Sequence, residues 1–192
     1  IQNQCIEFAL KEHRFDLILC LADKPAFDAS KPHFLLHDLV KRSVPVYVVK
    51  GLLKEGQYEA CTRDTYHLSI LDYAIVLKNQ ELIDFLIETK FCDINEPAGH
   101  FFSAPIYLAI RTGEIEIVKS VLSHPDIVLN QCSLIFKSPL DFVNNLLNDP
   151  KPLGLSNSLL SKEFLLECHN LLEEASSKNH NLLEEVSSKN RN

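Results

Sequence analysis

The stretch APIYLAIRTGEIEIVKSVL, from Ala104 to Leu122, decides the fold, because an amphipathic helical pattern stops within it and then starts again. Thr112 and Gly113 interrupt the pattern, and a glycine inside a helix costs about 1 kcal/mol relative to alanine. Pro105 suits the first turn of a helix, where its missing N–H is not needed. The stretch therefore predicts a hairpin of two short helices. A lone hairpin of this size cannot bury both apolar stripes, so it needs neighbours of the same kind.

The same pattern recurs along the chain. It consists of an apolar anchor, an alanine three positions later, and apolar pairs eleven and twelve, and fifteen and sixteen, positions after the anchor. With Ile106 as the anchor, the pattern recurs at Leu71 and Ile6, and in a weaker form at Leu36 and Leu140. The anchors are 30 to 35 residues apart, a spacing typical of stacked helical repeats.

Several motifs have the phase of this repeat. They are Ala104-Pro105-Ile106-Tyr107-Leu108-Ala109 and Ser138-Pro139-Leu140, which match Thr-Pro-Leu-His-x-Ala, together with Gly113 in a turn, LLKEG at 52–56, and Asp93-Ile94-Asn95. On these residues the sequence resembles the ankyrin-repeat family up to about residue 168. The resemblance implies an all-α solenoid of about five helical hairpins. The alternative is an irregular helical bundle, because bundles also contain short helices joined by short loops.

The repeats depart from the family pattern in two ways. The glycine of the turn between the two helices is replaced by His13, Ser43 and Lys78 in three copies, and the leucine-histidine pair occurs only at Leu36-His37. Hydrogen bonds from that histidine are therefore not expected in the other repeats, and stability is expected to depend more on packing.

Composition favours one soluble globular unit in the cytoplasm. Hydrophobic residues make up 46% and charged residues 23% of the 192 positions, and the net charge of −7 argues against a nucleic-acid partner. No apolar run approaches the ~18 residues of a membrane span, so membrane insertion is not expected. The six cysteines form no CxxC pairs and are expected to be reduced thiols.

Catalytic and cofactor motifs are missing from the sequence. No histidine or cysteine pair has the spacing of a zinc site, and no phosphate-binding glycine loop is present. Cys168 and His169 are neighbours, which places them about 100° apart on a helix and makes them a poor thiol–base pair. Cys20 is expected to fill a gap in the core. We therefore expect neither an enzyme nor a bound metal or cofactor.

The chain ends in a tandem duplication. HNLLEEASSKN at 169–179 is followed by HNLLEEVSSKN at 180–190, and an eleven-residue period places the leucines of both copies on one helical stripe. We expect the second helix of the last repeat to resume near Leu159, the repeat domain to span 1–168, and the tail to span 169–192. The first copy is expected to cap the repeats, while the weak helix formers at the junction leave the second copy free to project or to pack on another chain. The ending LLEEVSSKNRN also resembles the export signals of ankyrin proteins that intracellular bacteria inject into host cells.

These observations favour a non-catalytic module that binds a protein. The alternatives are the substrate-recruiting part of an enzyme whose catalytic domain precedes residue 1, and a structural module that self-associates through its tail. In the ankyrin family, partners are bound by loop tips and by the exposed side of the first helix of each hairpin. That resemblance implies a partner-binding set of Lys41, Arg63, Tyr66, His67, Tyr73, His100, Phe101, Phe102 and Arg111, with Phe8, Lys11, Arg42, Val76 and Leu108 beside it. This strip is basic and aromatic, so it predicts a partner segment that is acidic and partly apolar.

Overall fold

The computed structural model describes residues 2–22, 35–54, 61–97, 104–131, 133, 135–148 and 160–189. These residues form ten α-helices and no strand. The helices are α1 (Gln2–Lys11), α2 (Phe15–Ala22), α3 (Leu35–Lys41), α4 (Val46–Lys54), α5 (Ile70–Val76), α6 (Gln80–Thr89), α7 (Pro105–Thr112), α8 (Ile115–Leu122), α9 (Pro139–Asn148) and α10 (Lys162–Lys189).

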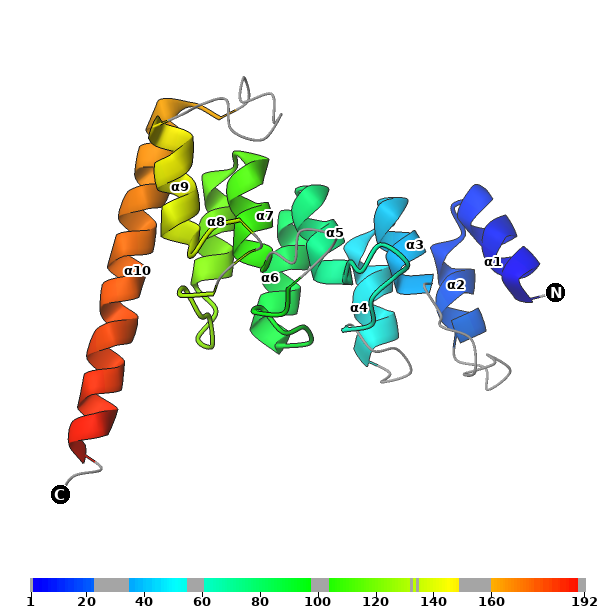
Figure 1. Ribbon diagram of the computed structural model, residues 1–192. Coiled ribbons are helices and arrows are strands. Elements are labelled where there is room, and N and C mark those ends of the chain that lie inside the picture. Colours follow the sequence, from blue (N-terminus) through cyan, green and yellow to red (C-terminus); the bar gives the residue numbers. More distant parts are fainter. Residues whose placement is uncertain are drawn as a thin grey trace.

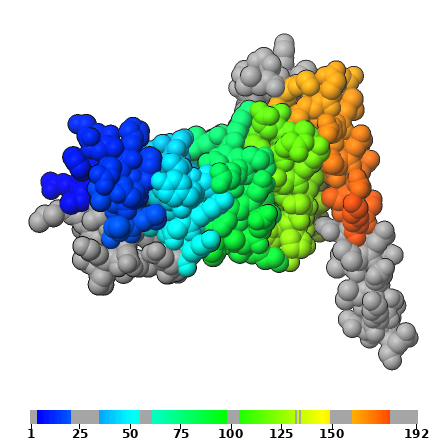
Figure 2. All heavy atoms as spheres, turned by 180° about the vertical axis from the view of Figure 1, so that it is seen from behind, coloured from blue at the N-terminus to red at the C-terminus, as the bar shows by residue number. Residues whose placement is uncertain are grey.

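The helices pair into five antiparallel hairpins that stand side by side in sequence order (Figures 1 and 2). The first helices of the hairpins contact one another, α3 with α5, α5 with α7, and α7 with α9. The second helices form another layer, in which α2 contacts α4, α6 contacts α8, and α8 contacts α10. The molecule is therefore a two-layer helical solenoid, as predicted, and not an irregular bundle.

The tight turn inside each of the first four hairpins contains one residue in the left-handed backbone conformation. Gly113 has φ 75°, and the residues expected to replace the turn glycine, His13, Ser43 and Lys78, have φ of 53°, 53° and 56°. A side chain in this conformation costs roughly 1–2 kcal/mol, whereas glycine adopts it freely. The turn geometry is thus retained in three repeats that lack its preferred residue.

Apolar residues at the repeat positions form one continuous core. The anchors Ile6, Leu36, Leu71 and Ile106 are all buried. Three residues after the anchor, Ala9, Ala74 and Ala109 have no exposed surface, as expected where neighbouring first helices approach closely. The predicted apolar pairs in the second helices are also largely buried, including Val48, Val49, Leu82, Ile83, Ile117 and Val118.

The position of the family histidine is occupied by residues that stabilise their own repeat. Asp72 accepts hydrogen bonds from the backbone N–H and the hydroxyl of Ser69, both at 2.8 Å, and forms a capping box at the start of α5. Tyr107 is buried and its hydroxyl donates to the carbonyl of Gln131 at 2.9 Å. Local hydrogen bonds therefore contribute to these repeats beside the packing on which they were expected to depend more.

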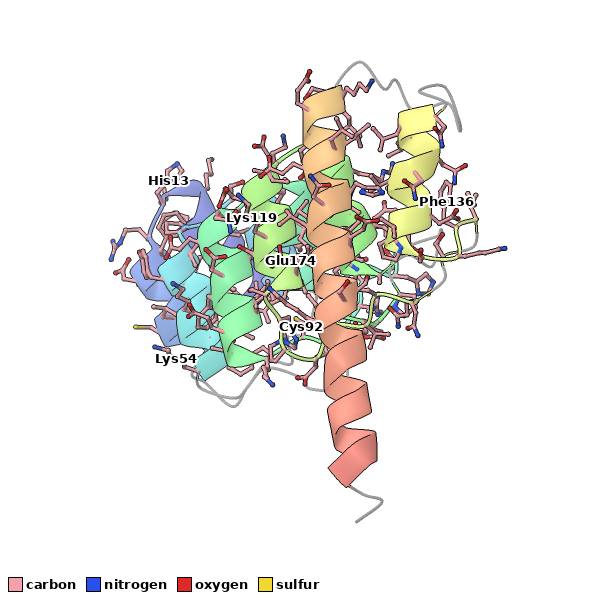
Figure 3. The ribbon with its side chains drawn as sticks, turned by 90° about the vertical axis from the view of Figure 1, so that its left-hand side faces the viewer. His13, Lys54, Cys92, Lys119, Phe136 and Glu174 are labelled. Carbon is pink, nitrogen blue, oxygen red and sulfur yellow. The ribbon has the colours of Figure 1, made fainter. Side chains whose placement is uncertain are left out.

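The last hairpin differs from the others because its second helix, α10, is long. Leu165, Cys168 and Leu172 are buried where α10 lies against α8 and α9, and Lys119 of α8 lies 3.5 Å from Glu167. Figures 1 and 3 show α10 standing at one end of the row of hairpins and projecting well past the ends of the neighbouring helices. The first copy of the duplication, 169–179, therefore begins on the part of α10 that covers the end of the stack.

Two sequence expectations need adjustment. The second helix of the last hairpin begins at Lys162, close to the expected Leu159, but it runs unbroken through the junction of the two tail copies; the division of the chain into 1–168 and 169–192 stays a prediction. Cys20 is exposed and not a core residue. Its neighbour Ile18 is fully buried, and two residues further along a helix a side chain points about 200° away.

Candidate protein-interaction face

The loop segment that precedes α5 is organised by one carboxylate. Asp64 Oδ1 accepts hydrogen bonds from the backbone N–H groups of Tyr66 (2.9 Å) and Leu68 (3.2 Å). This is the local bond by which an Asp side chain fixes a turn. The turn leaves the Tyr66 side chain 59% exposed and places His67 in the left-handed conformation with φ 58°. Tyr66 is therefore presented outward on a fixed backbone.

The other oxygen of Asp64 joins two neighbouring helices. Asp64 Oδ2 accepts from Tyr73 Oη of α5 at 2.6 Å and from Lys41 Nζ of α3 at 2.9 Å. Lys41 Nζ also lies 4.5 Å from the ring centroid of Tyr73 and 5.7 Å from that of Tyr66, within the range of a cation–π contact. Lys41, Asp64, Tyr66 and Tyr73 thus form a single cluster, which we call the tyrosine cluster.

The protonation states of the tyrosine cluster favour the ion pair. Burial raises the pKa of Asp64, but the hydrogen bonds from Tyr73 and Lys41 outweigh burial and lower it to about 2. Burial lowers the pKa of Lys41, and its bond to Asp64 more than compensates, so that this pKa lies above its ordinary value. The pKa of His37, which packs edge-on against Tyr73, is lowered mainly by burial. At neutral pH the cluster therefore contains a carboxylate and an ammonium group that neutralise one another.

Arg63 is held between two repeats. Its Nε donates to Glu96 Oε1 at 2.9 Å, its Nη1 donates to the His67 carbonyl at 2.7 Å, and Nη1 lies 3.9 Å from Asp72 Oδ2. These bonds leave 17% of the Arg63 side chain exposed. Arg63 thus connects the loop before α5 to the segment after α6 and contributes little free positive charge to the surface.

Arg111, the third cation of the predicted set after Lys41 and Arg63, has its side chain exposed to solvent. It is exposed near the end of α7, and within the part of the chain that the structure describes its guanidinium forms no ion pair. On the neighbouring first helices Val76 is 53% and Phe8 is 59% exposed, while Leu108 is half-buried. We call the exposed side of α1, α3, α5 and α7, together with segment 61–69, the inner face.

A hollow lies at the amino-terminal end of the inner face. It has a volume of about 610 Å³ and includes three residues of the predicted strip, Phe8, Lys11 and Arg42. Arg42 also pairs with Glu7 at 2.9 Å across α1 and α3. The remaining lining residues are Leu10, His13, Phe15, Ser43 and Val44. This end of the face thus combines apolar side chains with the charged Glu7, Lys11 and Arg42, and Phe8 is 59% exposed there.

Only some of the predicted site residues therefore contact one another in the structure. Lys41, Tyr66 and Tyr73 meet in the tyrosine cluster, Arg63 and His67 join each other beside it, and Arg111 lies two helices further along. His100, Phe101 and Phe102 fall outside the described residues. Sequence reasoning missed the carboxylates that pair with the cations, Asp64, Asp72 and Glu96. Asp64 and Asp72 carried local signals, since an Asp side chain can bond to the backbone two residues on in a turn, and Ser69-x-x-Asp72 before an apolar run is typical of a capping box. Glu96 carried no such signal.

No metal centre or membrane span is found among the residues with defined positions. These residues contain no cluster of three or more His, Cys, Asp or Glu side chains able to hold a metal ion. No helix in the described ranges is both long and apolar enough to cross a bilayer. The inner face carries exposed aromatic and apolar groups together with the exposed cations Lys11 and Arg111.

Comparison with known proteins identifies the architecture. The sequence matches no established family profile and no curated protein. Among solved structures 87 chains are similar, including the crystal structure of EF0377, an ankyrin repeat protein. That protein shares 15% sequence identity with this chain, and the match has a TM-score of 0.65 and covers 89% of this chain and 80% of the other. The chain is thus a divergent helical solenoid with the ankyrin-repeat fold.

Proposed function

We propose that the chain is a non-catalytic protein-interaction module that binds a partner through the inner face. The observation that carries this proposal is the tyrosine cluster, in which a buried carboxylate fixes Tyr66 in an exposed position. Rigid exposed tyrosines contribute strongly to binding, because little conformational entropy is lost when the partner covers them. A solenoid also offers a long continuous surface on which several such contacts add up.

We further propose that the bound segment is partly apolar and carries an acidic group. Tyr66, Val76 and Phe8 supply exposed apolar area on the inner face, and Arg111 supplies a guanidinium suited to a carboxylate. The ion pairs of Lys41 and Arg63 make the strip less basic than its composition suggests. The acidic group of the partner is therefore expected to meet Arg111 and not the tyrosine cluster.

Affinity capture from a eukaryotic cell lysate tests the proposal. The informative variant is Tyr66→Ala/Arg111→Glu, because both side chains are exposed and their loss leaves the core intact. Tyr73 is less suitable, since its hydroxyl holds Asp64 in place. Loss of two hot-spot contacts of about 1.4 to 2 kcal/mol each should reduce the affinity by roughly 100-fold or more, since each factor of ten corresponds to about 1.4 kcal/mol.

The matched control is Tyr47→Ala/Lys54→Glu on α4. Tyr47 is 54% exposed, almost as much as Tyr66, and Lys54 is also exposed, but both lie in the layer of second helices. The proposal is supported if the wild type and the control capture a protein that the inner-face variant does not capture. The inner-face variant must keep its helical circular-dichroism spectrum. Equal capture by all three proteins would refute it.

We also propose that this binding takes place in the cytoplasm of a host cell. The support is the resemblance of the tail, LLEEVSSKNRN, to export signals. Deletion of residues 180–192 is expected to abolish delivery into host cells in a translocation assay without changing capture by the inner face. Unchanged delivery of the truncated protein would reject this location and leave the binding proposal standing.

A further inference from the structure

Two cysteines that are far apart in sequence lie next to each other at the base of the third hairpin. Cys61 opens the segment that leads into α5, and Cys92 follows the end of α6. Because α5 and α6 are antiparallel, the segment that precedes α5 and the segment that follows α6 lie at the same end of the hairpin. The Cys61 thiol donates a hydrogen bond to the carbonyl oxygen of Phe91, the residue before Cys92, at 2.8 Å, and a side-chain hydrogen bond between the two cysteines is the main influence on the pKa of each. Cys92 is labelled in Figure 3.

The two thiols differ in exposure and in acidity. Cys61 is exposed, whereas Cys92 is buried. The hydrogen bond from Cys92 lowers the pKa of Cys61 to about 6, against the opposing effect of burial. The pKa of Cys92 is raised, by its bond to Cys61 and by burial. An accessible thiolate beside a protonated thiol is the arrangement in which one sulfur is oxidised first and the other then displaces the oxygen.

We propose that Cys61 and Cys92 are a redox-active pair that closes to a disulfide when a hydroperoxide oxidises Cys61. In the first step the Cys61 thiolate attacks one oxygen of hydrogen peroxide, the O–O bond breaks, and the products are a sulfenic acid and hydroxide. In the second step Cys92 gives up its proton and its sulfur attacks Cys61 Sγ, so that an S–S bond forms and water leaves. The protein loses two electrons, and the peroxide gains them.

The closure joins two segments that are already in contact. Cys61 Sγ lies against the carbonyl oxygen of the residue before Cys92, and the two sulfur atoms must approach to about 2.05 Å for the covalent bond. The bond would tie the segment before α5 to the segment after α6, a link that Arg63 and Glu96 already make non-covalently at 2.9 Å. It would therefore fix the base of the hairpin and raise its resistance to unfolding. This inference stands apart from the proposed function.

The other described cysteines lack this arrangement. Cys5 and Cys20 are exposed, and the structure gives neither of them a neighbouring thiol among the described residues. Cys168 is buried on the side of α10 that faces the stack, and burial raises its pKa to about 12. Oxidation is therefore expected to be selective for the pair.

Peptide mapping after treatment with hydrogen peroxide tests the proposal. The reduced full-length protein is exposed to the peroxide, alkylated with iodoacetamide, and cut with trypsin, which releases Cys61 in peptide 55–63 and Cys92 in peptide 91–111. We expect mass spectrometry to find these two peptides joined in most molecules, and dithiothreitol to separate them. The Cys20→Ser variant should form the link as fully as the wild type, while Cys61→Ser should lose it and keep its helical circular-dichroism spectrum.

Two results would overturn the proposal. One is that Cys61 and Cys92 remain as open to alkylation after peroxide as Cys5 and Cys20. The other is that Cys61 links to several different cysteines with similar yield, which would indicate unselective oxidation. Cys92→Ala provides a second check, because its Cys61 should then stop at the sulfenic acid, which dimedone traps, instead of forming a disulfide.

Discussion

Asp64 shows how one side chain can order a loop and join two helices. It has 3% of its side chain exposed, yet it remains charged, because it accepts hydrogen bonds from two backbone N–H groups, Lys41 and Tyr73. A buried carboxylate without such partners would be strongly destabilising. These hydrogen bonds offset the energetic cost of burying Asp64, and they fix the segment that presents Tyr66 on the proposed binding surface.

Replacement of this carboxylate should produce a pH-dependent loss of stability. The pKa of Asp64 is lowered to about 2 in the folded protein, so its charge stabilises the fold above the unfolded-state pKa and this contribution is lost as pH falls towards 2. At neutral pH Asp64→Asn should cost about 2 kcal/mol. Urea unfolding should show the difference from wild type shrinking by about 1 kcal/mol between pH 5 and pH 3. A difference independent of pH would mean that the carboxylate charge is not stabilising.

The turn residues in the left-handed conformation allow a reciprocal test. Ser43 has φ 53° and Gly113 has φ 75°, so Ser43→Gly removes backbone strain and Gly113→Ala introduces it. We expect Ser43→Gly to raise the free energy of unfolding by roughly 0.5–1 kcal/mol and Gly113→Ala to lower it by about 1 kcal/mol, both measured by urea denaturation. Changes of the same sign in the two variants would contradict this account of the turns.

At the scale of the helices, each element is stabilised mainly by its neighbours. The first and second helices are mostly 7 to 10 residues long, and isolated helices of this length are marginal in water. Burial on both sides of each hairpin supplies the stability that propensity does not. The end of such a stack needs a covering element, and α10 provides it through Leu165, Cys168 and Leu172.

Truncation of a buried leucine on α10 tests whether this helix caps the solenoid. Leu172 is 1% exposed and packs where α10 meets the stack, whereas Leu166 on the same helix is 46% exposed. Leu172→Ala should therefore lower the free energy of unfolding by about 2–4 kcal/mol, and Leu166→Ala should change it by less than about 1 kcal/mol. Thermal or urea denaturation distinguishes the two. Equal small effects would show that α10 does not cap the solenoid.

At the scale of the whole molecule, sequence reasoning succeeded where information is local or periodic. The anchors such as Ile106, the turn residues such as Lys78 and the helix start at Pro105 all follow from patterns within one repeat. Contacts between distant residues left no such pattern. The pairing of Lys41 with Asp64 and of Arg63 with Glu96 joins different repeats, and it turned an apparently basic strip into a largely neutralised one. The continuous α10 likewise overrides the weak helix propensity of its junction.

Hydrogen–deuterium exchange of the complex with a captured partner tests the central claim, binding through the inner face, most directly. The account predicts that the partner slows exchange by tenfold or more in segment 61–69, because its backbone presents Tyr66, and in the last turn of α7, which carries Arg111. Exchange in α4, which carries Tyr47 and Lys54, should stay unchanged. Protection confined to the second helices α4, α6 and α8, with segment 61–69 exchanging as in the free protein, would contradict the claim.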